Sequence, residues 1–166
     1  MELKRIILDT NIYGLVAVDE KREEIRRSIT SSGIVLYGST VIRKELRKTK
    51  KGIVDGVNLR NVLLSLYHEM TKDKELDLRD KHLKTAESYF SAYRELGGTA
   101  SKSKLLNDFL IVASASLHNL DIVVSEDNAT MLNELALKAY SVVNAALKID
   151  IPGFIGYEQF KKELKK

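Results

Sequence analysis

Two aspartates each follow an apolar segment of the kind that forms a buried strand. Asp9 comes directly after the apolar residues 6–8, and Asp127 comes three residues after Val124. If both segments are parallel strands, their carboxyl ends meet at one edge of a sheet, where open α/β proteins bind ligands. A single Asp in this position usually caps a helix or makes a turn. Two in matching contexts favour a shared site.

Asp108 lies in a segment, residues 105–113, that is apolar almost all round and is expected to pack as a helix against the sheet. A carboxylate on such a helix is costly unless its charge is compensated, because an unpaired buried charge tends to become neutral. A metal ion at Asp108 would compensate that charge. A buried salt bridge or a position at the helix edge is the alternative explanation.

Glu45 lies beside the apolar pair Ile42 and Leu46, on a helix expected to begin at Ser39 or Thr40 after the second strand, residues 34–37. It therefore borders the inward stripe of that helix, at the same edge of the sheet. A lone Glu among the basic residues of this segment is most often solvated or salt-bridged. Its assignment to a site depends on the other three acidic residues.

Metal binding is the chemistry expected of these four acidic residues. Two unit charges about 4 Å apart repel by on the order of 4 kcal/mol at an effective dielectric constant of about 20, and a divalent cation would remove that repulsion. Oxygen ligands favour Mg²⁺ or Mn²⁺ over Zn²⁺. The chain has no cysteine, and its histidines show no ligand spacing; they are His68, His82 and His118. We expect one or two ions.

Alternating strands and helices are expected to position the acidic residues. Continuous apolar runs predict buried strands at residues 5–8, 34–37, 121–124 and 140–143. The predicted helices cover residues 20–30, 40–50, 58–71, 78–96, 103–117, 129–139 and 157–165. This alternation predicts a parallel sheet covered by helices.

Composition indicates one globular domain over residues 1–166, because 166 residues that are 44% hydrophobic supply one ordinary core. The net charge of +4 suits binding to a polyanion. The absence of cysteine excludes disulfides, thiol nucleophiles and thiolate zinc sites. The apolar run before Asp9 is too short for a signal peptide or a membrane span, so we expect a cytoplasmic protein with no membrane partner.

Four segments together resemble the PIN-domain family. They are Ile-Leu-Asp9-Thr10-Asn11 near the start, a Glu early in the helix after the second strand, Asn107-Asp108-Phe-Leu-Ile-Val-Ala in the apolar helix, and Val-Val-Ser125-Glu126-Asp127 after a later strand. The similarity runs from about residue 5 to about residue 145. It implies a three-layer α/β/α sandwich with a central, mostly parallel sheet of four to five strands.

The resemblance also implies an activity and a set of site residues. The activity is hydrolysis of RNA phosphodiester bonds by a metal-dependent endoribonuclease, with Mg²⁺ or Mn²⁺ as cofactor. By position, the family's four catalytic and metal-binding places are taken by Asp9, Glu45, Asp108 and Asp127. Residues that would support these carboxylates or contact phosphate are Thr10, Asn11, Ser125 and Glu126, and Glu126 could exchange roles with Asp127.

Basic residues near this edge could hold the backbone of a nucleic acid. They are Arg43, Lys44, Arg47, Lys48, Lys50, Lys51, Lys102 and Lys104. Ordinary solvated helix faces explain them equally well. The expected partners are RNA as substrate, an antitoxin protein, and a second copy of the chain in a homodimer.

Several functions fit these residues. The nuclease could be the toxin of a toxin–antitoxin pair or an RNA-processing enzyme, and the stretch between Glu45 and Asp108 is longer than in compact toxin-type members. A non-catalytic PIN-like module that binds RNA or protein is the alternative, although it would be expected to lose some of the acidic residues. A haloacid-dehalogenase-like phosphatase with Asp9 as nucleophile is disfavoured, because it needs a second Asp where Asn11 stands.

Overall fold

A five-stranded sheet forms the centre of the protein. The computed structural model describes residues 2–50, 52–54 and 56–166. All neighbouring strands of the sheet are parallel, in the order β5-β2-β1-β6-β7. Its strands are β1 (Lys4–Leu8), β2 (Ile34–Ser39), β5 (Glu75–Leu76), β6 (Ile122–Val124) and β7 (Gly153–Ile155). A separate antiparallel pair is formed by β3 (Ile53–Val54) and β4 (Val57–Asn58).

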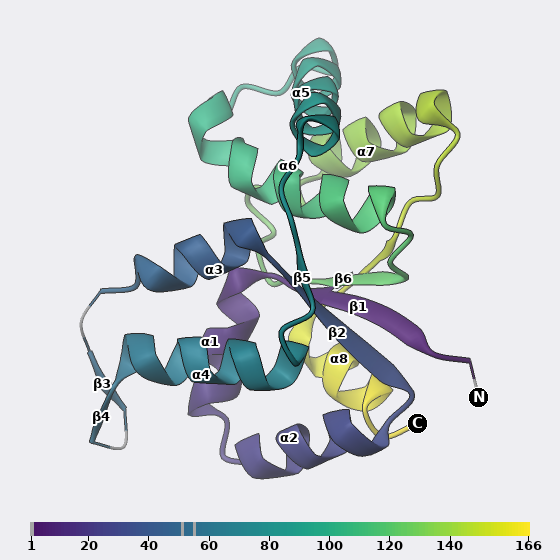
Figure 1. Ribbon diagram of the computed structural model, residues 1–166. Coiled ribbons are helices and arrows are strands. Elements are labelled where there is room, and N and C mark those ends of the chain that lie inside the picture. The colour runs from purple at the N-terminus through teal and green to yellow at the C-terminus, as the bar shows by residue number, and fades with distance from the viewer. Residues whose placement is uncertain (1, 51, 55) are drawn as a thin grey trace.

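Helices cover both faces of this sheet. They are α1 (Thr10–Val18), α2 (Arg22–Ser31), α3 (Thr40–Arg47), α4 (Leu59–Thr71), α5 (Asp80–Glu95), α6 (Lys102–Leu117), α7 (Glu134–Leu147) and α8 (Tyr157–Glu163). Figure 1 shows α5, α6 and α7 on one side of the sheet and α1, α2, α4 and α8 on the other. The predicted three-layer α/β/α sandwich with a mostly parallel sheet is confirmed. None of the described helices is long and apolar enough to cross a membrane.

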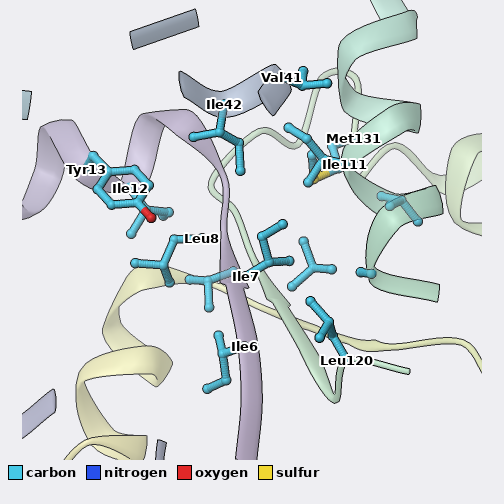
Figure 2. Packing of buried hydrophobic residues seen from close by; sticks show 14 of the residues in the cluster. Ile6, Ile7, Leu8, Ile12, Tyr13, Val41, Ile42, Ile111, Leu120 and Met131 are labelled. Atoms are coloured by element: carbon cyan, nitrogen blue, oxygen red, sulfur yellow. The ribbon is translucent and has the colours of Figure 1, made fainter. Parts of the chain in front are cut away.

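The middle strand β1 explains why the core forms here. Ile6, Ile7 and Leu8 are fully buried, because β1 pairs with β2 on one side and β6 on the other and helices cover both faces. Figure 2 shows core side chains on both faces of this strand, with Ile12 of α1 on one side and Ile111 of α6 on the other. A strand buried on both faces reads as a continuous apolar run, as residues 6–8 do.

The predicted strand at residues 140–143 is wrong, because these residues lie within α7. Tyr140 and Val143 are buried, but Ser141 and Val142 between them are exposed, which is helical and not strand-like spacing. Residues Val142 and Val143 are β-branched and suggested a strand. The alanine-rich surroundings and the packing of α7 against α5 override that preference. The fifth strand is instead β7, which follows Pro152.

Other helix boundaries also differ from the prediction. The segment at 10–18 was not predicted to be a helix, because its apolar residues continue directly from β1 and show little amphipathic spacing; it forms α1, capped by Asp9. Helix α7 begins at Glu134 and not near 129, because the Asn133 side chain caps it by accepting from the Leu135 N–H at 3.0 Å. Helix α3 ends at Arg47, short of the predicted residue 50.

The C-terminal helix α8 is fastened to the start of β1 by a buried carboxylate. Glu163 accepts hydrogen bonds from Lys4 Nζ and Lys166 Nζ, each at 2.5 Å. These two lysines, with a smaller contribution from Gln159, lower the pKa of Glu163 to about 2. The charged form of Glu163 therefore stabilises the folded state above the pKa of the unfolded chain, and this stabilisation is lost as the pH falls towards 2.

We predict that Glu163→Gln lowers the free energy of unfolding by about 1–2 kcal/mol at pH 7, less than the full pKa shift implies because both lysines are half exposed. The difference from the parent should shrink between about pH 4.5 and pH 2. Urea denaturation across this pH range measures it. As a control on the same helix, Glu158→Gln removes an exposed pair with Lys161 and should change stability by less than about 0.5 kcal/mol. Equal effects of the two substitutions would contradict the prediction.

Candidate functional site

The carboxyl ends of the neighbouring strands β1 and β6 bring Asp9 next to Ser125. Asp9 continues the pairing of these strands, because its backbone N–H donates to the Val124 carbonyl at 2.8 Å. Its carboxylate accepts from the Thr10 backbone N–H at 2.8 Å and from the Ser125 hydroxyl at 2.7 Å. Ser125 in turn accepts from the backbone N–H of Asp127 at 3.0 Å. Asp9 is only 5% exposed, so its carboxylate is held largely out of water.

Glu45 reaches the same edge from helix α3. This helix begins where β2 ends, and Ser39 caps it by accepting from the Ile42 N–H at 3.3 Å. The Thr10 hydroxyl donates to Glu45 Oε1 at 3.1 Å. Thr10 therefore links the start of α1 to the second turn of α3, because its backbone N–H contacts Asp9 and its hydroxyl contacts Glu45.

Asp108 and Asp127 meet at the hydroxyl of Thr130, a residue that the sequence analysis did not single out. Thr130 Oγ1 contacts Asp108 Oδ2, and it lies 2.5 Å from Asp127 Oδ2. Asp127 Oδ1 also accepts from the backbone N–H groups of Ala129 and Thr130, at 3.2 and 3.0 Å. The spacing Asp-x-x-Thr at 127–130 is typical of such a turn and could have indicated Thr130. Its single hydroxyl proton can serve only one of the two carboxylates at a time.

Burial and mutual repulsion raise the pKa values of three carboxyls in this group. Burial is the larger cause at Asp108, where it raises the pKa to about 7, together with repulsion from the other three acids. Burial also raises the pKa of Asp9 and of Glu45, with repulsion from Asp127 at the first and from Asp9 at the second. Lys48 opposes the shift at Glu45.

The donor set fits a hard divalent cation. Carboxylate oxygens held by hydroxyl and backbone donors, with almost no compensating lysine or arginine, are the ligands that Mg²⁺ and Mn²⁺ prefer. Among residues 2–50, 52–54 and 56–166, no three His, Cys, Asp or Glu side chains converge closely enough to hold one ion. Mg²⁺ is usually held by only one or two carboxylates and keeps several waters, so pairs of these carboxylates suffice. His82 and His118 lie apart from the group, with their Nε2 atoms 3.0 Å from each other.

The remaining candidates are placed differently. Glu126 accepts from the Tyr157 backbone N–H at 2.5 Å and therefore caps α8 instead of joining the four carboxylates. A β-carbon at Gly156 would lie 2.7 Å from Glu126 Oε1, so this glycine permits the close approach. Asn11 is exposed on the first turn of α1.

Of the basic candidates, Lys44 and Lys48 line a cavity together with Glu45. Arg43 pairs instead with Glu75, with Nε and Oε2 2.9 Å apart, and Lys102 pairs with Glu87. The others are exposed at their positions on or beside α3 and α6; they are Arg47, Lys50 and Lys104. Lys51 lies outside the described residues.

Comparisons with known proteins identify the family and the fold. The sequence profile of the PIN domain matches residues 6–136. Two solved structures are similar, each with a TM-score of 0.55: VapBC2 from Rickettsia felis bound to a DNA fragment from their promoter, and FitAB bound to an IR36 DNA fragment. The first is 12% identical over 92% of this chain and 98% of the other, and the second is 15% identical over 92% and 94%. At these identities the likeness concerns the fold alone. A search of curated proteins gives no match.

We predict that Asp108→Asn raises the free energy of unfolding of the metal-free protein by about 1 kcal/mol at pH 7, because it removes one of several carboxylates that repel each other out of water. Asn keeps an oxygen that can accept from Thr130. Denaturation in the presence of a chelator measures the change. Ser125→Ala should have the opposite sign, a loss of about 1–2 kcal/mol, because it removes the donor that holds buried Asp9. A large loss with Asp108→Asn would mark Asp108 as part of an ion pair.

Proposed function

The chain belongs to the PIN-domain family, and on that basis we propose that it is a metal-dependent endoribonuclease that hydrolyses RNA phosphodiester bonds. The observation that carries the proposal is the group of four carboxylates, Asp9, Glu45, Asp108 and Asp127, which repel each other. A purely structural role would gain nothing from that repulsion. Residues 1–166 are proposed to act as one nuclease domain.

In this proposal the four carboxylates hold one or two Mg²⁺ or Mn²⁺ ions. Asp9 and Asp108 are assigned as direct ligands, Asp127 as a ligand of a second or shared ion, and Glu45 as a ligand or as the group that positions a water molecule. The bound metal would supply Lewis-acid activation of the phosphodiester and of the attacking water. Neither a covalent intermediate nor a thiol is required.

The supporting side chains orient these carboxylates before any ligand binds. Ser125 and the Thr10 backbone each engage one oxygen of Asp9, and the Thr10 hydroxyl engages one oxygen of Glu45. Thr130 holds one oxygen of Asp108 beside one of Asp127. Hydrogen bonds of this kind fix the direction of metal-binding groups, and losing them commonly weakens metal affinity or activity. Ser125, Thr10 and Thr130 are therefore proposed as positioning residues.

The biological setting is proposed from the two similar structures. The toxin of a toxin–antitoxin pair, with an antitoxin protein as partner, is the setting favoured over an RNA-processing enzyme, because the fold is similar to those of VapBC2 and FitAB, each bound to a DNA fragment. A homodimer and a cytoplasmic location stay predictions. The non-catalytic alternative is disfavoured, because a module that only binds RNA has no use for four clustered carboxylates.

We predict that the purified protein cleaves single-stranded RNA with added Mn²⁺ or Mg²⁺ and that EDTA abolishes cleavage. Asp9→Asn and Asp108→Asn should each lower kcat by at least about 100-fold, because each removes a ligand charge that metal-assisted hydrolysis needs. Glu126→Gln is the control, because it changes the neighbouring carboxylate that caps α8; activity should stay within a few-fold of the parent. Cleavage that survives EDTA would exclude the metal mechanism, and equal losses with Asp108→Asn and Glu126→Gln would exclude the assigned ligands.

Metal binding can also be measured without activity. We predict that Mn²⁺ or Mg²⁺ raises the free energy of unfolding, by about 2.7 kcal/mol at a free concentration near 100 times Kd. Asp9→Asn should lose most of this stabilisation, while Glu163→Gln should keep it despite a lower baseline, because Glu163 lies at α8 and not at the carboxylate group. Thermal unfolding over a metal titration gives the comparison. A metal response equal in all three proteins would show that the ions bind elsewhere.

A further inference from the structure

A cavity of about 130 Å³ opens directly beside Glu45, between α3, α6 and the segment that precedes α5. Its lining residues are Thr40, Val41, Lys44, Glu45, Lys48, Leu78, Asn107 and Leu110. Because Glu45 belongs both to the cavity and to the four-carboxylate group, a chain bound across the carboxylates would pass its mouth. The cavity is not used by the chemistry described above.

The size and walls of the cavity suit one flat ring. The volume is close to the about 150 Å³ of an engineered apolar cavity that holds benzene, so the space matches one six-membered ring and is tight for a fused pair of rings. Val41 and Leu110 are buried, at 6% and 4% exposure, and Leu78 is half buried, so one wall of the cavity is apolar and held in place, while the other lining residues are polar or charged. Apolar walls favour the faces of a base over a phosphate or a free sugar.

Asn107 places a polar group at the rim of this apolar space. It precedes Asp108 on α6, so the same turn of helix presents Asp108 to the carboxylate group and Asn107 to the cavity. Its side chain is exposed, and its amide carries both a donor and an acceptor. The edge of uracil or cytosine offers a matching acceptor and donor. The Asn107 amide can therefore bind either pyrimidine, because a flip of the amide exchanges the positions of its oxygen and its nitrogen.

Two lysines give the mouth of the cavity the charge that RNA requires. Lys44 lies on α3 and Lys48 directly follows the end of α3; both line the cavity, and both are exposed. Lys48 lies close enough to Glu45 to lower the pKa that burial raises there. The positive charges of these lysines would offset the repulsion between the four carboxylates and the phosphates on either side of a bound base.

We propose that this cavity binds one pyrimidine base of single-stranded RNA next to the cleaved phosphodiester, and that Asn107 reads the edge of that base. The inference rests on the proposed ribonuclease function for its substrate, but the contacts that carry it are those of the cavity itself. It makes this chain a nuclease with a preference at one position of its substrate.

Binding can be tested without catalysis by NMR titration of the full chain in the presence of Mg²⁺. Uridine and cytidine 5′-monophosphates should shift the methyl signals of Leu78 and Leu110 and the side-chain amide of Asn107. Ribose 5-phosphate, which has no base, should leave these signals in place, and adenosine 5′-monophosphate should shift them less. Equal shifts with all four compounds, or none with any, would overturn the proposal.

Kinetics on RNA provide the second test. Removing the base at one nucleotide beside the cut should lower kcat/KM by on the order of 10-fold, as expected for loss of one bound base. Asn107→Ala should also lower kcat/KM on intact RNA, and the loss should be clearly smaller on the substrate that lacks that base. Asn61→Ala, an exposed amide on α4 that lines a different cavity, is the matched control and should stay within twofold on both substrates.

The outcomes separate this inference from the proposed function. Cleavage that is equally fast at every abasic position and insensitive to Asn107→Ala would leave the nuclease standing and remove the pyrimidine site. Pyrimidine-specific NMR shifts in a protein that cleaves no RNA would support the site and remove the proposed activity. A preference for purines at the same nucleotide would contradict the size argument.

Discussion

Repulsion among four carboxylates is the constraint around which this protein is arranged. Asp9, Glu45, Asp108 and Asp127 come from four separate segments, and burial makes the charges of Asp9, Glu45 and Asp108 more costly than they would be in water. The protein opposes that cost with hydroxyl and backbone N–H donors at Asp9, Glu45 and Asp108.

The centre of the sheet fixes the position of Asp9. β1 is buried on both faces and paired on both sides, so its carboxyl end is fixed, and the backbone bond from Asp9 to Val124 extends this order into the site. Ser125, fully buried at the end of β6, joins the carboxylate of Asp9 to the backbone of Asp127. The hydroxyl network therefore continues the sheet's own hydrogen bonding and does not depend on mobile surface residues.

Side chains of adjacent residues point in different directions and therefore have different roles. Asp127 turns towards Thr130 and the carboxylates, while Glu126, one residue earlier, caps α8. Asp108 and Asn107 divide in the same way between the carboxylate group and the adjacent cavity. Arg43 binds Glu75, whereas Lys44 faces the cavity. Each division follows from the angle between successive side chains on a helix or turn.

The sequence by itself determined three of the sheet's five strands, β1, β2 and β6, and the positions of the acidic residues at or near their carboxyl ends. The runs at 5–8, 34–37 and 121–124 predicted strands, because short continuous apolar segments are typical of strands buried on both faces. Only the tertiary structure decided which way each side chain points and what it touches, as with Glu126 and Thr130. It also decided that residues 140–143 are helical, because packing of α7 against α5 outweighs the local preference of two valines for a strand. Local sequence patterns indicate which segments are buried, whereas contacts between distant segments depend on how those segments pack in the tertiary structure.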